Sequence, residues 1–184
     1  MSSYLKYSLI KYLKGRGKSH SSAFTLVELI VVVVIIGILS SIAIPSFQNA
    51  SDKAKQKEAS TLLASYTKAA QAYFTEYGQS PANTADLGQY ISITACKGND
   101  PKACKADAPQ NLTTATVAAW KSPSGLFDIV MAPSGDYLYF TAVPAGKYAT
   151  SGFGVSSCFN SKTGATKLTE MTEKGPDKVK KNPC

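Results

Sequence analysis

Few residues in this chain are of a type that could carry out chemistry. Its one histidine, His20, lies in a basic stretch near the N-terminus, and its four cysteines all lie in the second half of the chain: Cys96, Cys104, Cys158 and Cys184. A zinc site usually needs closely spaced Cys or His pairs, and the chain has no Cys-x-x-Cys pair. The spacing therefore predicts disulfides rather than a metal site, and we expect neither a metal nor a cofactor.

The other residue of unusual chemistry is Glu28, the only formal charge in the apolar segment 24–44. A carboxylate near the centre of a bilayer costs roughly 2.5–3.5 kcal/mol on insertion scales, and less near the end of a spanning segment. A nearby positive charge would offset that cost. Glu28 therefore indicates either a functional charge pair or a glutamate that is tolerated at the membrane boundary.

The element that must position Glu28 is the segment 24–44 itself. At about 1.5 Å per residue, a helix of this length spans the hydrocarbon core of a membrane. Five basic residues and no acidic residue precede Phe24, which predicts that the N-terminus stays in the cytoplasm and the C-terminus crosses. Without those five, the chain has 15 basic and 12 acidic residues, so its net charge of +8 is weak support for nucleic-acid binding.

The remainder of the chain, residues 46–184, predicts a globular head. Over 46–77 apolar residues recur every three or four positions, which indicates an amphipathic helix with an aromatic face, ended by Gly78. Residues 79–125 are rich in proline and predict loops, and residues 126–184 predict an antiparallel sheet with strands at 126–131, 136–143, 152–159 and 165–170. The expected apolar stripe of the helix is Ala59, Leu62, Leu63, Tyr66, Ala69, Ala70, Tyr73, Phe74 and Tyr77.

One face of the expected sheet should pack on that stripe. Phe127, Ile129 and Met131 alternate along the first strand, with Leu138 and Phe140 opposite them on the second. Alternate residues of a strand point to the same face of a sheet. The expected fold is therefore α+β, a long N-terminal helix whose second half packs on an antiparallel sheet of about four strands.

A short motif suggests what this architecture is for. After the basic leader, the residues Ala23-Phe24-Thr25-Leu26-Val27-Glu28-Leu29 open the apolar run. They resemble the class III signal of type IV pilins and pseudopilins. The resemblance implies that a prepilin peptidase cuts between Ala23 and Phe24, removes the leader 1–23, and methylates the new amino group of Phe24. The family usually has glycine where this chain has Ala23, and many members have shorter leaders, so slower cleavage is expected.

The resemblance extends to Gly37 and Pro45. Pro45 has no N–H to donate to the carbonyl of Ser41, and Gly37 adds backbone freedom. In assembled pili of the family, the corresponding stretch of helix is often unwound, which makes these two residues a predicted helix break. The alternative is a simple kink at the membrane surface.

The resemblance also implies a function. Residues 24–45 would span the inner membrane and then form the filament core, while the head, most like those of cyanobacterial type IV pilins, would cover an extracellular pilus used for motility, adhesion or DNA uptake. The partners would be other copies of the chain, the prepilin peptidase, minor pilins, and the inner-membrane assembly platform and ATPase. The Glu28 carboxylate would pair with the Phe24 amine during assembly. The mature chain would hold no histidine, which excludes a Ser/His/Asp triad, so we expect no enzyme.

Other functions are open at this point. The same N-terminal chemistry occurs in pseudopilins of type II secretion systems, and a minor pilin with an adhesive or DNA-uptake role is a further alternative. Cleavage after the small-x-small sequence Ser41-Ile42-Ala43 would instead release a soluble binding protein.

The four cysteines allow three disulfide pairings. Pairing of neighbours in sequence gives Cys96–Cys104, which closes a small loop, and Cys158–Cys184, which ties the lysine-rich C-terminal tail to a strand. Each would stabilise the fold by roughly 2–4 kcal/mol in the loop-entropy model.

Overall fold

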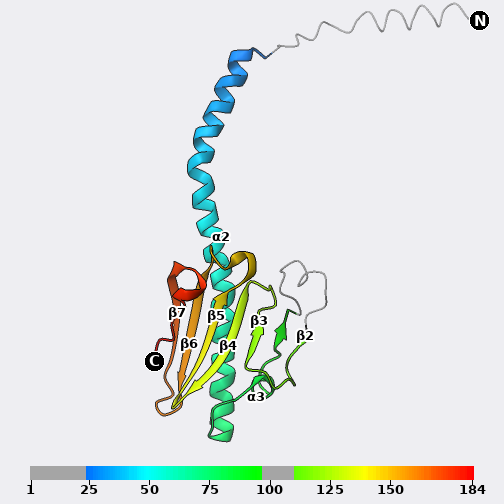
Figure 1. The fold of residues 1–184 in the computed structure, drawn as a ribbon, viewed down its shortest axis with the longest axis vertical. Coiled ribbons are helices and arrows are strands. Elements are labelled where there is room, and N and C mark those ends of the chain that lie inside the picture. The colour runs from blue at the N-terminus through cyan, green and yellow to red at the C-terminus, as the bar shows by residue number, and fades with distance from the viewer. Residues whose placement is uncertain (1–23, 97–109) are drawn as a thin grey trace, which may run out of the picture. The chain divides into compact units, whose positions relative to one another are not determined.

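The computed structural model describes residues 24–96 and 110–184 (Figure 1). The predicted leader 1–23, with Ala23, and the segment that holds Cys104 lie outside the described residues. The chain divides into two units, Met1–Ile44 and Pro45–Cys184. Helix α2, Leu26–Tyr77, contributes residues to both.

The N-terminal part of α2 exposes its apolar side chains. Every described residue before Asn49 is exposed except Ser40, which is partly exposed, although the run Val31–Ile36 is entirely aliphatic. By length and composition, α2 is a helix that could cross a membrane. The backbone is helical at Gly37 and through Pro45, so the predicted break remains a prediction for the assembled state. A continuous exposed apolar surface of this extent marks a membrane or protein contact site.

The second half of α2 packs through the predicted stripe, with one exception. Leu63, Tyr66, Ala70 and their neighbours are buried, but Tyr77 is 47% exposed and its hydroxyl donates to Gln89 at 2.8 Å, so its assignment to the core was wrong. The helix ends where the sequence predicted, because Gly78 has a φ of +68°. That left-handed conformation is inexpensive only for glycine.

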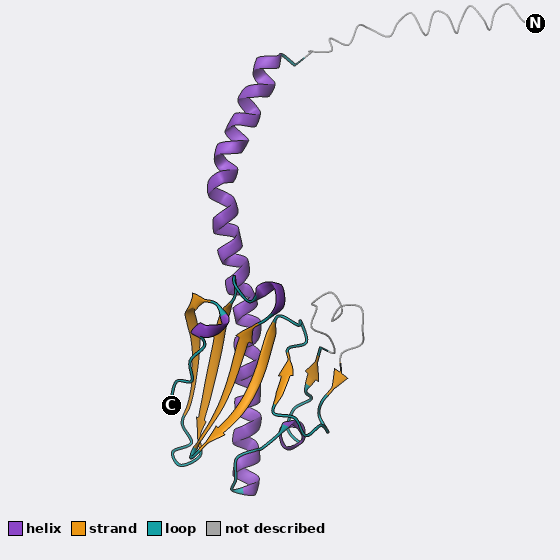
Figure 2. Ribbon diagram, in the orientation of Figure 1, coloured by secondary structure: helices purple, strands orange, loops and turns teal. Residues whose placement is uncertain are grey.

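One face of a five-stranded antiparallel sheet covers this part of α2 (Figures 1 and 2). The order is β3-β4-β5-β6-β7, and each strand pairs with the next along the chain. The four predicted strands are β4 (Phe127–Ser134), β5 (Tyr137–Pro144), β6 (Phe153–Asn160) and β7 (Thr166–Lys174). The fifth, β3 (Ala119–Lys121), lies in the stretch expected to be loop, where Trp120 pairs with Ile129.

The core forms where the sheet meets α2, as the alternation predicted. Met131 pairs with Phe140, and both side chains are buried. Tyr66 of α2 lies between rings of the sheet, with its centroid 5.4 Å from that of Trp120 and 6.1 Å from that of Phe140. Aromatic pairs at this spacing add to the stability gained from area burial alone.

The predicted loop region 79–125 also contains a short helix, α3 (Thr84–Gly88), and two short paired strands, β1 (Thr94–Ala95) and β2 (Gln110–Asn111). Asn83 caps the N-terminus of α3, and its side chain accepts hydrogen bonds from the backbone N–H groups of Ala85 and Asp86. Two short 3-10 helices follow later, η1 (Gly146–Tyr148) and η2 (Pro176–Lys178).

Strand β6 is buried on both faces, which is unusual for a sheet covered by a helix on one side. Toward α2, the hydroxyl of Ser157 lies 2.8 Å from that of Thr67. On the opposite face the C-terminal tail crosses the strand. A Cβ added to Gly154 would lie 2.1 Å from Cγ2 of Val179 in that tail, and Cys158 is disulfide-bonded to Cys184. The sheet therefore has a second, smaller layer made by residues 175–184.

Candidate functional site

The start of α2 holds Glu28 in a reciprocal hydrogen-bonded cap. The backbone N–H and the hydroxyl of Thr25 both donate to Glu28 Oε2, at 2.9 and 2.7 Å, and the backbone N–H of Glu28 donates back to Thr25 Oγ1 at 3.2 Å. This arrangement is a capping box, which satisfies N–H groups that a helix start leaves without partners. The spacing Thr-x-x-Glu signals such a cap in the sequence, which the two predictions for Glu28, a charge pair with the Phe24 amine or a tolerated boundary glutamate, did not include.

None of these three hydrogen bonds uses the nitrogen of Phe24, so cleavage before Phe24 leaves the cap chemically intact. Phe24 itself is 82% exposed and Glu28 is exposed. A carboxylate at a helix N-terminus also interacts favourably with the helix dipole. The cap therefore gives Glu28 a defined position one turn from the amine that cleavage would create, and only one of its two carboxylate oxygens accepts these bonds.

Other predicted site residues that the structure describes include Gly37, which has open space around it, and three cysteines, which form disulfides. A side chain added at Gly37 would meet nothing within 4 Å, so no contact among the described residues requires glycine there. Cys158 and Cys184 form the predicted disulfide, with their Cα atoms 5.7 Å apart. Cys96 is also disulfide-bonded, and its predicted partner Cys104 lies outside the described residues.

A row of polar contacts joins α2 to strand β6 and to the edge strand β7. Gln56 Nε2 donates to the carbonyl oxygens of Gly154 and Met171, at 2.9 and 2.8 Å. Lys57 Nζ and the Ser60 hydroxyl donate to the carboxylate of Glu170, with shortest distances of 2.8 and 2.6 Å. These hydrogen bonds, from Lys57 first, lower the pKa of Glu170 below its ordinary value.

This row was not predicted, because only the apolar stripe of the helix was expected to pack on the sheet. Gln56 and Ser60 are in fact buried, with four-residue spacing that places them on one helix face. Their regular spacing beside the apolar stripe was the available signal. The contacts fix how the helix lies across the sheet within the second unit.

The fold and the N-terminal segment together define a class. An exposed apolar helix that begins at a Phe-Thr-Leu-x-Glu motif and continues into an α+β head is the architecture of a protein with an N-terminal helix apolar enough to anchor it in a membrane. Residues 18–44 match the family model of the prokaryotic N-terminal methylation motif.

Comparison with known proteins finds relatives that are named fimbrial proteins and type IV pilins. Over 96 residues the chain is 32% identical to a fimbrial protein of Neisseria meningitidis serogroup A, covering 52% of this chain and 55% of that protein. It is 32% identical over 94 residues to the type IV major pilin protein PilE1 of Neisseria gonorrhoeae, covering 51% of each. It is 44% identical over 85 residues to the type IV major pilin protein PilA of Myxococcus xanthus, covering 46% of this chain and 37% of that protein.

The chain thus spans about half the length of the first two relatives, and less of the third. The motif and these relatives together support the type IV pilin family, as the sequence predicted. The predicted likeness of the head to cyanobacterial pilins is not among these findings and remains a prediction.

Proposed function

We propose that this protein is the precursor of a structural subunit of a type IV pilus, with no catalytic site of its own. The observation that carries the proposal is the methylation motif at residues 18–44, whose described part, residues 24–44, is apolar, helical from Leu26 and exposed except at partly exposed Ser40. A helix of this kind needs a membrane before assembly and a bundle of identical helices afterwards. The relatives are named pilins and fimbrial proteins, which favours a pilus over a secretion pseudopilus.

The proposed course has three stages. The precursor spans the inner membrane through residues 24–45 with its head outside; a prepilin peptidase removes residues 1–23 and methylates Phe24; and an assembly platform with its ATPase moves the subunit into the filament, where minor pilins also act. The head, residues 46–184, then forms the filament surface. Motility, adhesion and DNA uptake are the uses that such a filament would serve.

Glu28 acts in assembly rather than in folding. Its cap with Thr25 leaves one carboxylate oxygen available, and cleavage places a new ammonium group four residues before it. A charge pair between Glu28 of one subunit and the Phe24 amine of the same or a neighbouring subunit would offset the cost of the carboxylate in the apolar core and set the register of the helices. Gly37 and Pro45 would allow the helix to unwind locally as the bundle forms.

Mass spectrometry of purified filaments tests the processing step. The mature chain should begin with N-methylated Phe24. Ala23→Gly should be cleaved at least as fast as the wild type, whereas Ala23→Val, bulkier at the cut, should accumulate precursor. Filaments that retain residues 1–23, or a mature chain that begins at Ile44, would refute the proposal.

The role of Glu28 is tested by counting sheared filaments by electron microscopy, set against membrane-bound subunit by immunoblot. Glu28→Val should leave subunit level and cleavage normal but give few or no filaments, and Glu28→Asp should be intermediate. Thr25→Ala is the matched control, because it removes a capping hydroxyl but keeps the carboxylate. If Thr25→Ala were as defective as Glu28→Val, the cap alone would explain the importance of Glu28.

A further inference from the structure

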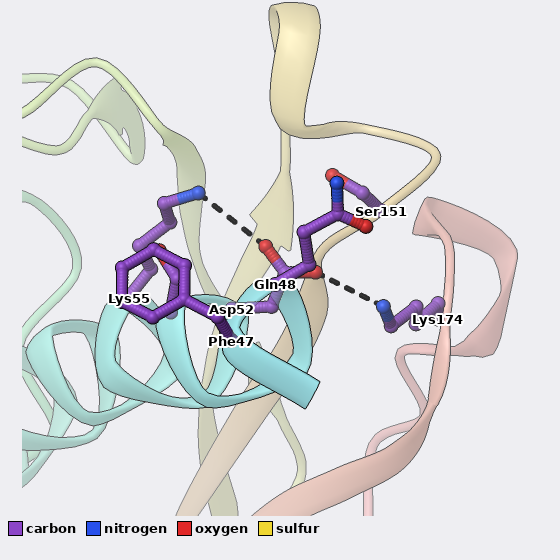
Figure 3. A pocket seen from close by; sticks show the side chains of 7 residues that line it. Phe47, Gln48, Asp52, Lys55, Ser151 and Lys174 are labelled. Atoms are coloured by element: carbon purple, nitrogen blue, oxygen red, sulfur yellow. Dashed lines mark hydrogen bonds and ion pairs between the residues drawn. The ribbon is translucent and has the colours of Figure 1, made fainter. Parts of the chain in front are cut away.

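The head carries a basic cavity close in sequence to the apolar segment. It has a volume of about 380 Å³ and lies between α2, the segment that connects η1 to β6, and the end of β7 (Figure 3). Its lining includes Phe47, Ser51, Asp52, Lys55, Ser151 and Lys174.

Two lysines in this cavity share one carboxylate. Lys55 Nζ lies 3.3 Å from Asp52 Oδ1, and Lys174 Nζ lies 3.0 Å from Asp52 Oδ2 (Figure 3). Lys174 also donates to Asn49 at 3.0 Å, whereas Asp52 is the one hydrogen-bond acceptor of Lys55 among the described residues. Each ammonium has three N–H donors, so both retain donors for an anion. Their side chains are 37% and 35% exposed, which makes those donors accessible.

Aromatic rings hold the two ammonium groups in place. Lys55 Nζ lies 4.7 Å from the ring centroid of Tyr148, and Lys174 Nζ lies 5.3 Å from that of Phe153. The hydroxyl of Tyr148 in turn donates to the backbone carbonyl of Asp52 at 2.7 Å. Cation–π contacts at these distances are attractive. Contacts within the folded head therefore hold the ammonium groups of Lys55 and Lys174 in place, so these side chains do not rotate freely.

The distance of the cavity from the end of the apolar segment is similar to the thickness of the headgroup layer of a membrane. Phe47 follows the apolar segment 24–44 by three residues and is 76% exposed. Asp52, whose carboxylate lies 3.3 Å from Lys55 Nζ, is five residues beyond Phe47, about 7.5 Å along the helix axis. Side chains of a helix lean toward its N-terminus, and lysine stems extend toward the interface. The headgroup layer on each side of a bilayer is roughly 5–7 Å thick, so Phe47 would reach the hydrocarbon boundary while Lys55 reaches the phosphates.

We propose that this cavity binds the phosphate groups of anionic phospholipids while the subunit waits in the membrane. Lys55 and Lys174 would donate to the phosphate oxygens, the hydroxyls of Ser51 and Ser151 would supply further donors, and Phe47 would insert among the upper acyl carbons. The inference rests on the membrane stage of the proposed function. It adds a second attachment of the subunit to the membrane, which assembly must release.

Lysine footprinting of the full chain tests this site. The chain is reconstituted in vesicles of phosphatidylcholine alone or with phosphatidylglycerol, exposed to an amine-acetylating reagent, and analysed by mass spectrometry. An anionic membrane surface stabilises a nearby lysine by about 1 kcal/mol, which is about fivefold in an equilibrium constant. Because lysines that contact phosphate are shielded from the reagent, Lys55 and Lys174 should be acetylated about fivefold more slowly with phosphatidylglycerol present. Exposed Lys167, on β7 away from the cavity, should change little, and added salt should abolish the difference.

Variants separate the cavity from general charge attraction. Ser151→Asp places a carboxylate in the cavity and should remove the protection, whereas Thr163→Asp, an exposed turn residue outside the cavity lining, adds the same charge and should leave it. Thermal unfolding of both variants checks that the head is folded, and Phe47→Ser should weaken the protection without changing charge.

Four results would overturn the inference or its basis. Equal acetylation in both vesicle types would exclude the lipid site. Equal protection by inorganic phosphate added to phosphatidylcholine vesicles would assign the cavity to a free anion. Protection that rises with protein density without phosphatidylglycerol would assign it to a second copy of the chain. A chain that fails to float with either vesicle would refute the membrane stage itself, and with it the proposed function.

Discussion

The disulfide between Cys158 and Cys184 offers the sharpest test of the second layer over β6. The change is the double substitution Cys158→Ala with Cys184→Ala. Alanine is preferred to serine because Cys158 is fully buried, and a serine would place a hydroxyl there without a partner. The expected result is a folded head of lower stability in which the outer face of β6 exchanges with solvent.

The magnitude follows from the length of chain that the disulfide closes. For a sequence separation of 26 residues, the loop-entropy model gives about 3.5 kcal/mol at 25 °C. The second unit, Pro45–Cys184, contains 140 residues. With an unfolding entropy of about 2.1 cal/mol/K per residue, the loss corresponds to a fall in Tm of roughly 12 °C. The hydrogen bond from the Cys184 N–H to Cys158 Sγ, at 3.2 Å, is lost as well.

Thermal unfolding of the full chain in detergent, followed by near-ultraviolet circular dichroism, measures this loss, and hydrogen exchange of the β6 amides measures the uncovering. The matched control is Ser156→Ala on the same strand. Ser156 is also buried, and its hydroxyl has no partner among the described residues, so its removal should be neutral or slightly stabilising. A loss below about 1 kcal/mol in the double variant would show that the tail does not need the disulfide to cover β6.

Three further changes test contacts described above. Gly154→Ala should cost about 1–3 kcal/mol, because its Cβ would lie 2.1 Å from Val179 Cγ2, and adding Val179→Ala should recover part of the loss in chemical denaturation. Gln56→Leu leaves two carbonyl oxygens without their donor and should cost about 1–3 kcal/mol in the same assay. The lowered pKa of Glu170 means that its carboxylate stabilises the fold above its unfolded pKa of about 4.3, and that this contribution is lost as the pH falls through the lower folded pKa. Unfolding free energy measured against pH should therefore decline on acidification, and Glu170→Gln should flatten that decline, while a profile unchanged by Glu170→Gln would refute the assignment.

Periodicity alone predicted most of the head. The four long strands and the helix end at Gly78 carry strong local signals, since alternation and a left-handed glycine are properties of neighbouring residues. Strand β3 was missed because three residues are too few to show alternation, and Trp120 becomes a strand residue only by pairing with Ile129. Tyr77 fits the helical period but lies at the last turn, beyond the reach of the sheet.

The N-terminal motif could be predicted from the sequence because its residue types, their order and their position all match one known signal. The polar contacts within the head could not be predicted in this way. Gln56 and Glu170 are 114 positions apart in sequence, yet both make hydrogen bonds where α2 meets β7. Gln56 donates to the carbonyl of Met171, and Glu170 accepts from Ser60. No local pattern encodes such a pairing, because it depends on the register between α2 and β7. The basic cavity is a further case, since Lys55 and Lys174 meet only through Asp52.

The row of contacts between α2 and the sheet also determines how the head would respond to mechanical load. Gln56, Lys57, Ser60 and Thr67 all bind the sheet, over about 16 Å of helix. In the proposed filament, a pull along α2 would load these hydrogen bonds together in shear rather than open them one after another. If the proposed filament forms, several modest hydrogen bonds between α2 and the sheet would share the force on each head.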